Sequence, residues 1–566
     1  MKIPYIHLSF KSTVPSDDYW DMELIKDMLA GKFGRDVNGY EYERMSDKAS
    51  LKHGIVIFPA RAQLDCLDRL QAYIDNMDWV VLMIVGDEEA LFKFEELQHP
   101  RMHIYVMSPR KQARYLRDNV SFLGTGYSPA VRHLDFIPPV KDIDYFFAGQ
   151  VTHERRQIMN KYIRSLEGDT NWNGKYLATT SFTSGLDPEE YIETMARAKV
   201  AVCPSGPETP DTFRLFEALE CGAVPIADTR VPSNKNNADF GDDYWEFFFG
   251  EPVPFPVITD WGNLHGYIQD VLDNYDAISV KVATWWNNYK YIMTSRLSNI
   301  IYDLSGLDAI VLEPVTILIP TSPIKSHPST AIINETIMNT AKHFKQPVQI
   351  VVMADGISET TKQYSEAYAE YLRRVLWQAS RGKYNVLVLT HDKHLHQANM
   401  AREAVEMAVA TPCILFVEHD APLVPDFDFD FDLLCQPILS GEVNVLRFHH
   451  EAQVLDVHRH LMLEAPTRKN GVPLWRTRQW SQRPHLANTE FYRTMLANYF
   501  DDKPTMIEDV MHGVVDNKVL EGGMMAWYEF RLCMYYPETK NIKRSYHIDG
   551  RAGDIKVISD DNLEAI

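Results

Sequence analysis

Two carboxylates, Glu418 and Asp420, stand one residue apart directly after a short apolar run, 413–417. A run that is apolar throughout is typical of a strand buried on both faces of an α/β sheet. Ligands bind such sheets at the carboxyl ends of the strands, where carboxylates can hold Mg²⁺ or Mn²⁺ while substrate phosphates complete the shell. The pair therefore predicts a cation site for a diphosphate substrate. A solvated acidic turn after a strand is the alternative interpretation.

The elements that must position this pair can be predicted upstream of it. Small apolar residues recur at helical spacing through 397–409, which predicts an amphipathic helix. Pro412 ends this helix because proline lacks the amide donor. Three further strands and two helices are predicted, at 315–320, 348–353 and 386–389 and at 330–344 and 372–378. Alternating strands and helices indicate a parallel sheet.

The segment 397–420 resembles the glycosyltransferase family 2 motif, A-R-N followed by F-L-D-x-D, of the GT-A fold. Ala401-Arg402 matches its beginning and residues 416–420 match its end, with glutamate replacing the first aspartate. The resemblance implies a nucleotide-sugar donor, with a UDP-sugar favoured, and Mn²⁺ or Mg²⁺ held by Asp420 with help from Glu418. It also implies donor contacts from Arg402, Thr321 and Asp355.

The same resemblance assigns roles to later residues. The acid pair Glu508-Asp509 would supply the general base of an inverting transfer, with Asp509 preferred and Glu508 second. A late histidine would be a further metal ligand, which makes His547 the candidate and His512 its competitor. Acids in the first turn of a helix are also favoured by the helix dipole, so a structural role for the pair stays open.

Two other segments carry unusual composition. Residues 459–483 combine basic side chains with tryptophans, which suits stacking against sugars or bases beside phosphates. We predict that Trp475, Arg478 and Trp480 lie on the acceptor side, although ordinary core tryptophans in a loop would give the same pattern. The alternating D-F-D-F-D-F-D at 426–432 contains formal D-x-D matches, but its position predicts a loop before a helix rather than a metal site.

The first half of the chain also alternates between strands and helices, and it contains no G-x-G-x-x-G sequence that would favour dinucleotide binding. Within residues 1–140 the predicted strands are 3–10, 54–58, 79–85 and 103–107, and the predicted helices are 17–29, 62–76 and 88–97. Beyond them the predicted strands are 143–149, 200–204 and 223–227, and the predicted helices are 154–166, 213–220, 264–274 and 278–304.

Phe147-Ala148-Gly149 and the segment 212–226, TFRLFEALECGAVPI, resemble the donor-binding domain of exostosin-like GT-B glycosyltransferases. Those proteins carry F-x-G and, later, S-x-R-x-x-E-A-x-x-x-G-x-x-P-V. The resemblance implies that Arg214 faces the donor diphosphate and Glu217 the ribose hydroxyls, roles that suit a guanidinium and a carboxylate. Gly149 would let the backbone approach the ligand. A surface ion pair between Arg214 and Glu217 is the alternative, and the imperfect acid pair leaves the stereochemistry of this half open.

The predicted fold class is α/β, with a GT-B-like pair of Rossmann-type domains followed by a GT-A-like domain. The expected boundaries are 1–140 for the GT-B N-terminal domain and 141–304 for the donor-binding domain, then a linker at 305–314 and the GT-A-like domain at 315–566. A chain of 566 residues is long enough for three domains.

Composition narrows the class of protein. A net charge of −21 disfavours a general binder of nucleic acids or anionic membranes. The six cysteines form no C-x-x-C pair, which suits a reducing compartment and no zinc site. The first residues lack the apolar stretch of a signal peptide, and no run of about 18 apolar residues occurs. We therefore expect a cytoplasmic protein without membrane insertion.

Together these features predict a bifunctional glycosyltransferase that moves sugars from nucleotide-sugar donors to hydroxyl acceptors on a glycan or glycoconjugate. The GT-A half would be metal-dependent and inverting. Three alternatives stay open: an acceptor that is hydroxymethylated DNA, one module that is a non-catalytic binding domain, and a non-enzymatic scaffold.

Overall fold

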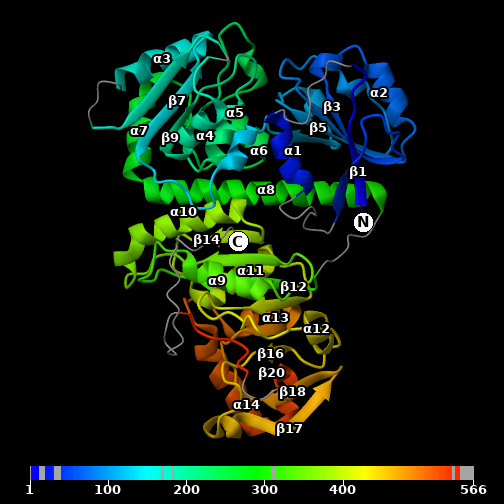
Figure 1. The fold of residues 1–566 in the computed structure, drawn as a ribbon, viewed down its shortest axis with the longest axis vertical. Coiled ribbons are helices and arrows are strands. Elements are labelled where there is room, and N and C mark those ends of the chain that lie inside the picture. The colour runs from blue at the N-terminus through cyan, green and yellow to red at the C-terminus, as the bar shows by residue number, and fades with distance from the viewer. Residues whose placement is uncertain are drawn as a thin grey trace. The chain divides into compact units, whose positions relative to one another are not determined.

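The computed structural model describes residues 2–11, 20–30, 40–166, 171–181, 184–306, 313–537 and 542–548. The chain divides into two compact units, Met1–Ile310 and Val311–Ile566, each with its own sheets (Figure 1). The division falls between residues 310 and 311. None of the described helices combines the length and the apolar character that crossing a membrane requires.

The first sheet of unit 1 is parallel, in the order β2-β1-β3-β4-β5-β6. Its central strand β4 is buried throughout, as its apolar sequence requires. Among the described residues of this part, the strands and α-helices are β1 Lys2–His7, β2 Glu41–Arg44, β3 His53–Pro59, β4 Trp79–Val85, β5 Met102–Met107, β6 Val120–Leu123, α1 Trp20–Ala30 and α2 Leu67–Ile74. The predicted strands are confirmed, while β2 and β6 were not predicted.

The helix predicted at 88–97 is wrong. This segment is a loop whose only regular structure is a single 3₁₀ turn, Phe94–Glu96. The carboxylate of Asp87 accepts hydrogen bonds from the backbone N–H groups of Leu91 (2.9 Å) and Phe92 (3.1 Å), and these bonds close the loop. Phe92 and Phe94 are buried in the core beneath it. A side-chain acceptor therefore takes the place of helical backbone bonding here.

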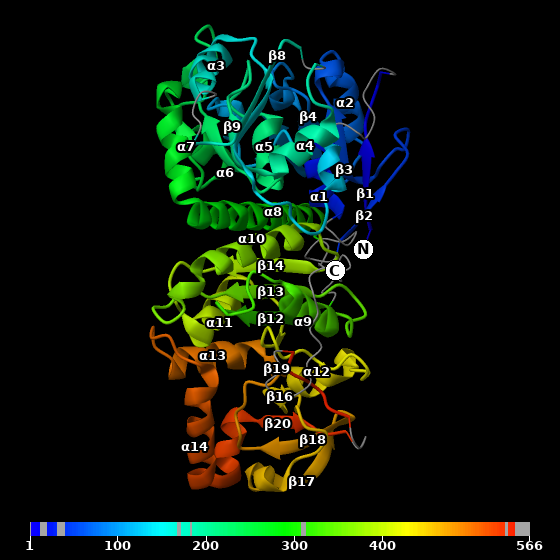
Figure 2. The same cartoon turned by 60° about the vertical axis from the view of Figure 1, so that its left-hand side comes forward.

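The second sheet of unit 1 is also parallel, in the order β11-β10-β9-β7-β8. Helices α3 and α5 have the bounds that the sequence predicts, because each has a clear apolar stripe. The elements are β7 Ile143–Gln150, β8 Gly174–Thr179, β9 Ala198–Cys203, β10 Val224–Asp228, β11 Val257–Ile258, α3 Glu154–Leu166, α4 Pro188–Ala196, α5 Phe213–Glu220, α6 Tyr244–Phe249 and α7 Leu264–Asp273. A long helix, α8 Tyr275–Ser305, packs against α1 and β4 of one sheet and α5 and β10 of the other (Figures 1 and 2).

Unit 2 contains one mixed sheet, in the order β14-β13-β12-β15-β19-β16-β20-β18-β17. The first four strands in this order are parallel, and β19 joins antiparallel to both β15 and β16. The strands are β12 Val315–Thr321, β13 Gln349–Ala354, β14 Asn385–Thr390, β15 Cys413–Phe416, β16 Val445–Arg447, β17 Met462–Lys469, β18 Val472–Thr477, β19 His485–Asn488 and β20 Leu532–Tyr535. The helices are α9 Ala331–Ala341, α10 Ser365–Arg381, α11 His396–Met407, α12 Phe431–Leu439, α13 Thr489–Tyr499 and α14 Ile507–Phe530.

The alternating segment 426–432 leads into α12, as predicted. Phe429 and Phe431 are buried, and Asp430 caps the helix by accepting from the backbone N–H of Leu433 at 3.2 Å. The carboxylates of Asp430 and Asp432 lie 3.8 and 2.6 Å from the Nζ of Lys345. These aspartates therefore serve capping and surface ion pairing in the structure.

Candidate functional site

In unit 1 a cavity of about 550 Å³ opens at the carboxyl ends of β7 and β8. Its lining includes all three residues that the exostosin-like motif singled out, Gly149, Arg214 and Glu217. It also includes Arg156 and Tyr191, which the sequence had not suggested. The cavity thus brings together residues from the end of β7 and the starts of α3, α4 and α5.

The guanidinium of Arg214 packs against all three residues of Phe147-Ala148-Gly149. The guanidinium of Arg214 lies 4.7 Å from the centre of the Phe147 ring, and its Nη2 donates to the carbonyl oxygen of Ala148 at 2.9 Å. Gly149 has φ +152°, and a Cβ there would stand 2.1 Å from Nη2 of Arg214. Only glycine therefore allows the guanidinium to lie across this strand end.

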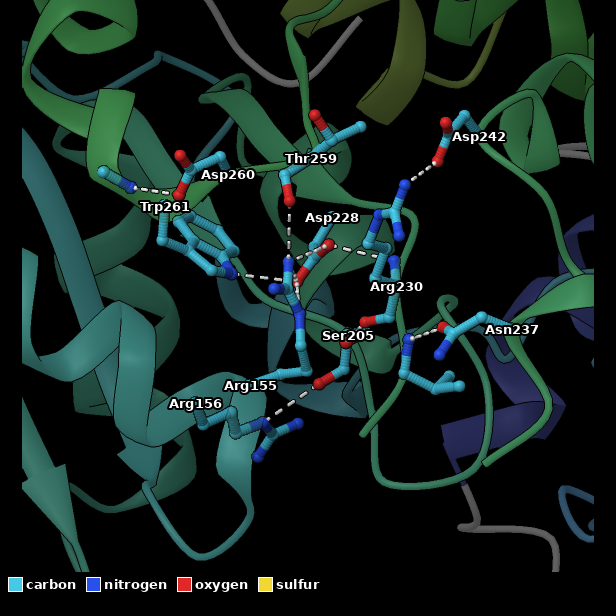
Figure 3. A network of polar contacts seen from close by, with 12 residues as sticks. Arg155, Arg156, Ser205, Asp228, Arg230, Asn237, Asp242, Thr259, Asp260 and Trp261 are labelled. Carbon is cyan, nitrogen blue, oxygen red and sulfur yellow. Dashed lines mark hydrogen bonds and ion pairs between the residues drawn. The ribbon is translucent and has the colours of Figure 1, made fainter. Parts of the chain in front are cut away.

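Arg156 is the cavity's second guanidinium. Its Nε donates to the carbonyl oxygen of Ser205 (3.1 Å, Figure 3) and its Nη1 to that of Gln150 (3.3 Å), so its described partners are neutral. Burial and then the charge of Arg214 lower the pKa of Arg156 to about 9. Arg156 and Arg214 repel each other, and neither forms an ion pair among the described contacts. This arrangement favours an anion bound between them.

The neighbouring Arg155 is satisfied by protein groups instead. Its Nε and Nη2 reach the fully buried carboxylate of Asp228, at the end of β10, at 3.1 and 2.8 Å (Figure 3). Asp228 also accepts from the indole N–H of Trp261 (2.8 Å) and the backbone N–H of Arg230 (2.9 Å). This network ties the first turn of α3 to the sheet, and thereby fixes where Arg156 lies.

Glu217 lies on the cavity wall with only 4% of its surface exposed. Burial raises the pKa of its carboxyl to about 7, although the charge of Arg214 and hydrogen bonds with Tyr191 and the Ser128 backbone oppose the rise. No ion pair between Arg214 and Glu217 occurs among the described contacts, so the alternative of a surface pair finds no support. A carboxyl with a pKa of about 7 can accept hydrogen bonds from the hydroxyl groups of a diol when it is ionised and can donate one when it is protonated.

In unit 2, Glu418 and Asp420 follow β15 at the edge of the sheet, where the sequence places them. The amide Nε2 of Gln397, on α11, donates to Oε1 of Glu418 at 2.9 Å. The backbone N–H of Ile548 donates to the carbonyl oxygen of Asp420 at 2.9 Å, and Asp420 is 5% exposed. The acid pair is thus held between α11 and the segment 544–548.

Glu508, in the first turn of α14, belongs to the same electrostatic group. Burial, the charge of Asp420 and the charge of Glu508 all raise the pKa of Glu418, to about 7. Oε2 of Glu508 accepts from the backbone N–H of Gln482 at 3.1 Å, whereas Asp509 is exposed. Among the described contacts Glu418, Asp420 and Glu508 have no cationic partner, so this group fits a bound cation.

Arginines lie near these acids without pairing with them. Arg447, at the end of β16, is 5% exposed and donates to Oε1 of Gln479 at 3.0 Å. Burial lowers its pKa to about 10, while the charge of Glu508 opposes the change and that of Arg483 adds to it. Arg483 contacts Nε2 of His547 and lowers the pKa of Glu418 through its charge. Unpaired acids beside unpaired arginines are complementary to a cation bound to a phosphate.

The structure does not itself define a metal centre. Among the described residues no three His, Cys, Asp or Glu side chains converge as metal ligands. Nε2 of His547 accepts from Arg483, so a role as metal ligand would require that contact to break. Asp420 and Glu418 are the residues that fit a hard cation, because substrate phosphates and water usually supply the rest of its shell.

Three predicted donor residues of unit 2 have their polar groups occupied. Thr321 is buried, with its hydroxyl 3.0 Å from that of Tyr371. Arg402 donates through Nη2 to the carbonyl oxygen of Phe500 at 2.7 Å and through Nη1 to Asp502 at 3.3 Å, and so joins α11 to the α13–α14 connection. Asp355 accepts from the backbone of the loop before α11, as described below.

The predicted acceptor-side residues lie on or beside the hairpin β17–β18. Trp475 and Trp480 are 7% and 2% exposed, and the indole N–H of Trp475 donates to the carbonyl oxygen of Glu464 at 3.1 Å. Nη1 of Arg478 lies 3.2 Å from Oδ1 of Asp516. Burial of both rings favours the alternative interpretation, in which they are core tryptophans.

Of the residues that sequence reasoning missed, Arg156 and Arg447 stand out. Arg156 follows Gly149 by seven positions at the start of a helix, and the double arginine at 155–156 was an available signal. Arg447 ends a three-residue strand and offers no motif.

Comparison with known proteins adds one family match. Residues 170–304, which include α4 to α7 and most of α8, match the family model for the RXYLT1 C-terminal domain, a glycosyltransferase-related family. No curated protein sequence matches the chain.

Several solved structures of glycosyltransferases also show similarity. Residues 1–349 of TarS from S. aureus are 14% identical, with 42% of this chain and 60% of that one covered and a TM-score of 0.25. HepE from Anabaena in complex with UDP is 13% identical over 54% and 100% of the two chains, with a TM-score of 0.26. GalNAc-T7 with UDP, GalNAc and Mn²⁺ is 11% identical over 41% and 43%, with a TM-score of 0.24. The chain thus spans about three fifths of the TarS fragment.

Proposed function

We propose that this protein is a glycosyltransferase that uses nucleotide-sugar donors, with one donor site in each unit. The observation that carries the proposal is the set of arginines without a described carboxylate partner at the carboxyl ends of strands: Arg156 and Arg214 in unit 1, and Arg447 in unit 2. A guanidinium withdrawn from bulk water without a counter-ion is costly. A diphosphate would supply the missing charge, and its two phosphates match paired arginines.

In unit 1 the donor diphosphate would lie between Arg156 and Arg214. The missing side chain at Gly149 leaves room for the guanidinium of Arg214 to lie across the strand end, where it could reach the diphosphate. Glu217 would hold the ribose hydroxyls. An ionised carboxylate accepts hydrogen bonds from hydroxyl groups, and a carboxyl with a pKa of about 7 can also donate one when it is protonated. The cavity of about 550 Å³ is large enough for a nucleotide.

In unit 2 we assign Asp420 and Glu418 to Mn²⁺ or Mg²⁺, which would act as a Lewis acid on the leaving diphosphate. Arg447 and Arg483 would bind the phosphate oxygens that face away from the acids. Asp509, exposed at the start of α14, would take the proton of the acceptor hydroxyl as it attacks the anomeric carbon, which gives an inverting displacement. Glu508 is the second candidate, but its carboxylate already holds the backbone of Gln482.

We propose a glycan or glycoconjugate rather than modified DNA as the acceptor. A DNA acceptor was suggested by the basic, tryptophan-containing segment 459–483. In the structure that segment forms β17 and β18, and its tryptophans are buried. Stacking on bases needs exposed rings.

The test is a thermal-shift panel of nucleotide sugars on the full-length chain, with and without Mn²⁺, since a ligand that binds the native state raises the melting temperature. We expect stabilisation by at least one UDP-sugar. Arg214→Gln should remove the part that is independent of Mn²⁺, and Asp420→Asn the part that depends on it. Exposed Glu193→Gln on α4 is the matched control. No shift with any nucleotide sugar would contradict the proposal.

A further inference from the structure

The loop 391–395, between β14 and α11, lies directly on Asp355-Gly356 at the end of β13. A Cβ on Gly356 would stand 2.3 Å from the backbone carbon of Lys393 and 2.8 Å from the backbone nitrogen of His394. Only glycine therefore permits this approach of two backbones. The loop is packed against the strand end rather than projecting from it.

Asp355 is the residue that holds the loop. Its Oδ1 accepts from the backbone N–H groups of Gly356 (2.9 Å), Leu395 (2.7 Å) and His396 (3.3 Å). Its Oδ2 accepts from His396 N–H at 3.2 Å and lies 2.8 Å from Nδ1 of His394. With 3% exposure and both oxygens occupied, Asp355 has little capacity left for a ligand.

His396 has a backbone conformation that costs energy. Its φ is +57°, in the left-handed region that residues with a Cβ rarely adopt. Such a residue persists when its surroundings over-determine it, and positions of this kind cluster at functional sites. Here the surroundings are the hydrogen bonds from Leu395 and His396 to Asp355.

The hydrogen bonding of His396 also fixes its tautomer. The backbone N–H of Gln397 donates to Nδ1 of His396 at 2.9 Å, so Nδ1 is the acceptor. Burial is the main reason that the pKa of His396 is lowered, which favours the neutral ring at pH 7. The proton of a neutral ring is then on Nε2. No described residue accepts a hydrogen bond from that Nε2–H.

This free donor lies among the groups assigned to substrate. The charges of Asp355 and Asp509 both act on His396, and the next residue, Gln397, donates to Glu418. His396 therefore lies beside the end of β13, next in the chain to a residue that contacts an acid after β15, and within range of the charge of Asp509 at the start of α14.

We propose that His396 is a binding residue of unit 2, whose Nε2–H donates to an oxygen of the bound nucleotide sugar, and that Asp355 is a positioning residue that acts through His396. This inference rests on the proposed donor site in unit 2. It replaces direct nucleoside binding by Asp355 with an indirect role. The oxygen belongs either to the nucleotide or to the sugar, and the two sources can be separated by experiment.

The experiment titrates UDP and UDP-glucose, with Mn²⁺, into full-length protein that carries Arg214→Gln, so that binding reports on unit 2. His396→Gly removes the ring and also the conformational strain, because glycine accepts a positive φ. We expect about tenfold weaker binding, the effect of one lost hydrogen bond, with a melting temperature equal to or above that of the parent. His391→Ala, which removes a ring bonded to the Ala354 carbonyl and Glu403, is the control and should leave binding unchanged.

The role of Asp355 is tested by a double-mutant cycle with Asp355→Asn. If Asp355 acts through His396, adding Asp355→Asn to His396→Gly should weaken binding little further. Equal weakening of both ligands places the oxygen on the nucleotide, and weakening of UDP-glucose alone places it on the sugar. Unchanged binding by His396→Gly, or additive effects in the cycle, would overturn the inference. No binding by the parent would instead overturn the donor site itself.

Discussion

At Arg156, Glu217 and Glu418, burial disfavours the charged form of the side chain. Arg156 loses basicity while the two glutamates become weaker acids, with pKa values of about 9, 7 and 7. Such pKa shifts cluster at functional sites, because a bound ligand can supply the opposite charge that the protein itself does not place beside the group. The three side chains line the edges at which parallel strands end, so geometry and electrostatics indicate the same places.

Glu217 gives a prediction about pH. Its carboxyl has a pKa of about 7 in the folded protein against an ordinary value of 4.5. Between these values the folded state binds more protons than the unfolded state, so the free energy of unfolding falls as pH rises. The full difference is about 3 kcal/mol above pH 7. Glu217→Gln removes this cost, and should be more stable than the wild type at pH 8 by up to about that amount and equal to it at pH 4.

The measurement is denaturant unfolding of both proteins from pH 4 to pH 8. The exposed Glu193→Gln serves as the control and should follow the wild type throughout. A constant difference between Glu217→Gln and the wild type across the range would show that the Glu217 carboxyl titrates normally.

Asp420 gives a second prediction at the same scale. Its charge is one reason that the pKa of Glu418 is raised, so Asp420→Asn should lower the pKa of Glu418. The variant keeps its shape but loses the carboxylate that we assign to the cation. We expect the Mn²⁺-dependent rise in melting temperature with UDP-sugars to disappear, while the fold stays intact by circular dichroism. A full Mn²⁺-dependent shift in Asp420→Asn would remove Asp420 from the proposed metal site.

At the scale of elements, the start of α3 depends on one buried ion pair. Asp228 accepts from Arg155, Trp261 and the backbone of Arg230, and all of these partners lose a charge-assisted bond if the carboxylate is removed. Breaking one side of a buried pair typically costs about 3–5 kcal/mol. We expect Asp228→Asn to lower the free energy of unfolding of unit 1 by a value near the lower end of this range, measured by denaturant titration.

The same network supplies the control. Asp242 pairs with Arg230 at 2.9 Å, but 64% of its side chain is exposed (Figure 3). An exposed pair contributes less than about 1 kcal/mol, so Asp242→Asn should be nearly neutral. Equal losses in the two variants would contradict the assignment of Asp228 as the anchor of α3.

Elements with a strong apolar pattern could be predicted from the sequence, and elements without one could not. β4, α3 and α5 are buried along a face or throughout, and their bounds follow from that. Edge strand β8 is exposed along most of its length, so no alternation marks it. The sequence predicts a helix in the loop after β4, and this prediction is wrong because the capping by Asp87 depends on three-dimensional contacts.

The site was predictable to the extent that it rests on local motifs. Gly149, Arg214 and Glu217 belong to short patterns and do share one cavity. Trp475 and Trp480 could not be separated from surface tryptophans, because their burial depends on strands far away in the sequence. The role of Asp355 could not be inferred either, since its partners lie in the loop about 40 residues later.

At the scale of the whole molecule, each unit has its own sheets and core, and the chain divides at residues 310 and 311. Units of this kind can unfold independently, in which case a single melting temperature is not defined. We expect two transitions by differential scanning calorimetry. Asp228→Asn should lower the melting temperature of only one transition. In the Arg214→Gln variant, where unit 1 should no longer bind the donor, a UDP-sugar with Mn²⁺ should raise the melting temperature of the other. If one transition responded to both changes, the two units would have to be treated as a single cooperative structure, and the donor sites as coupled.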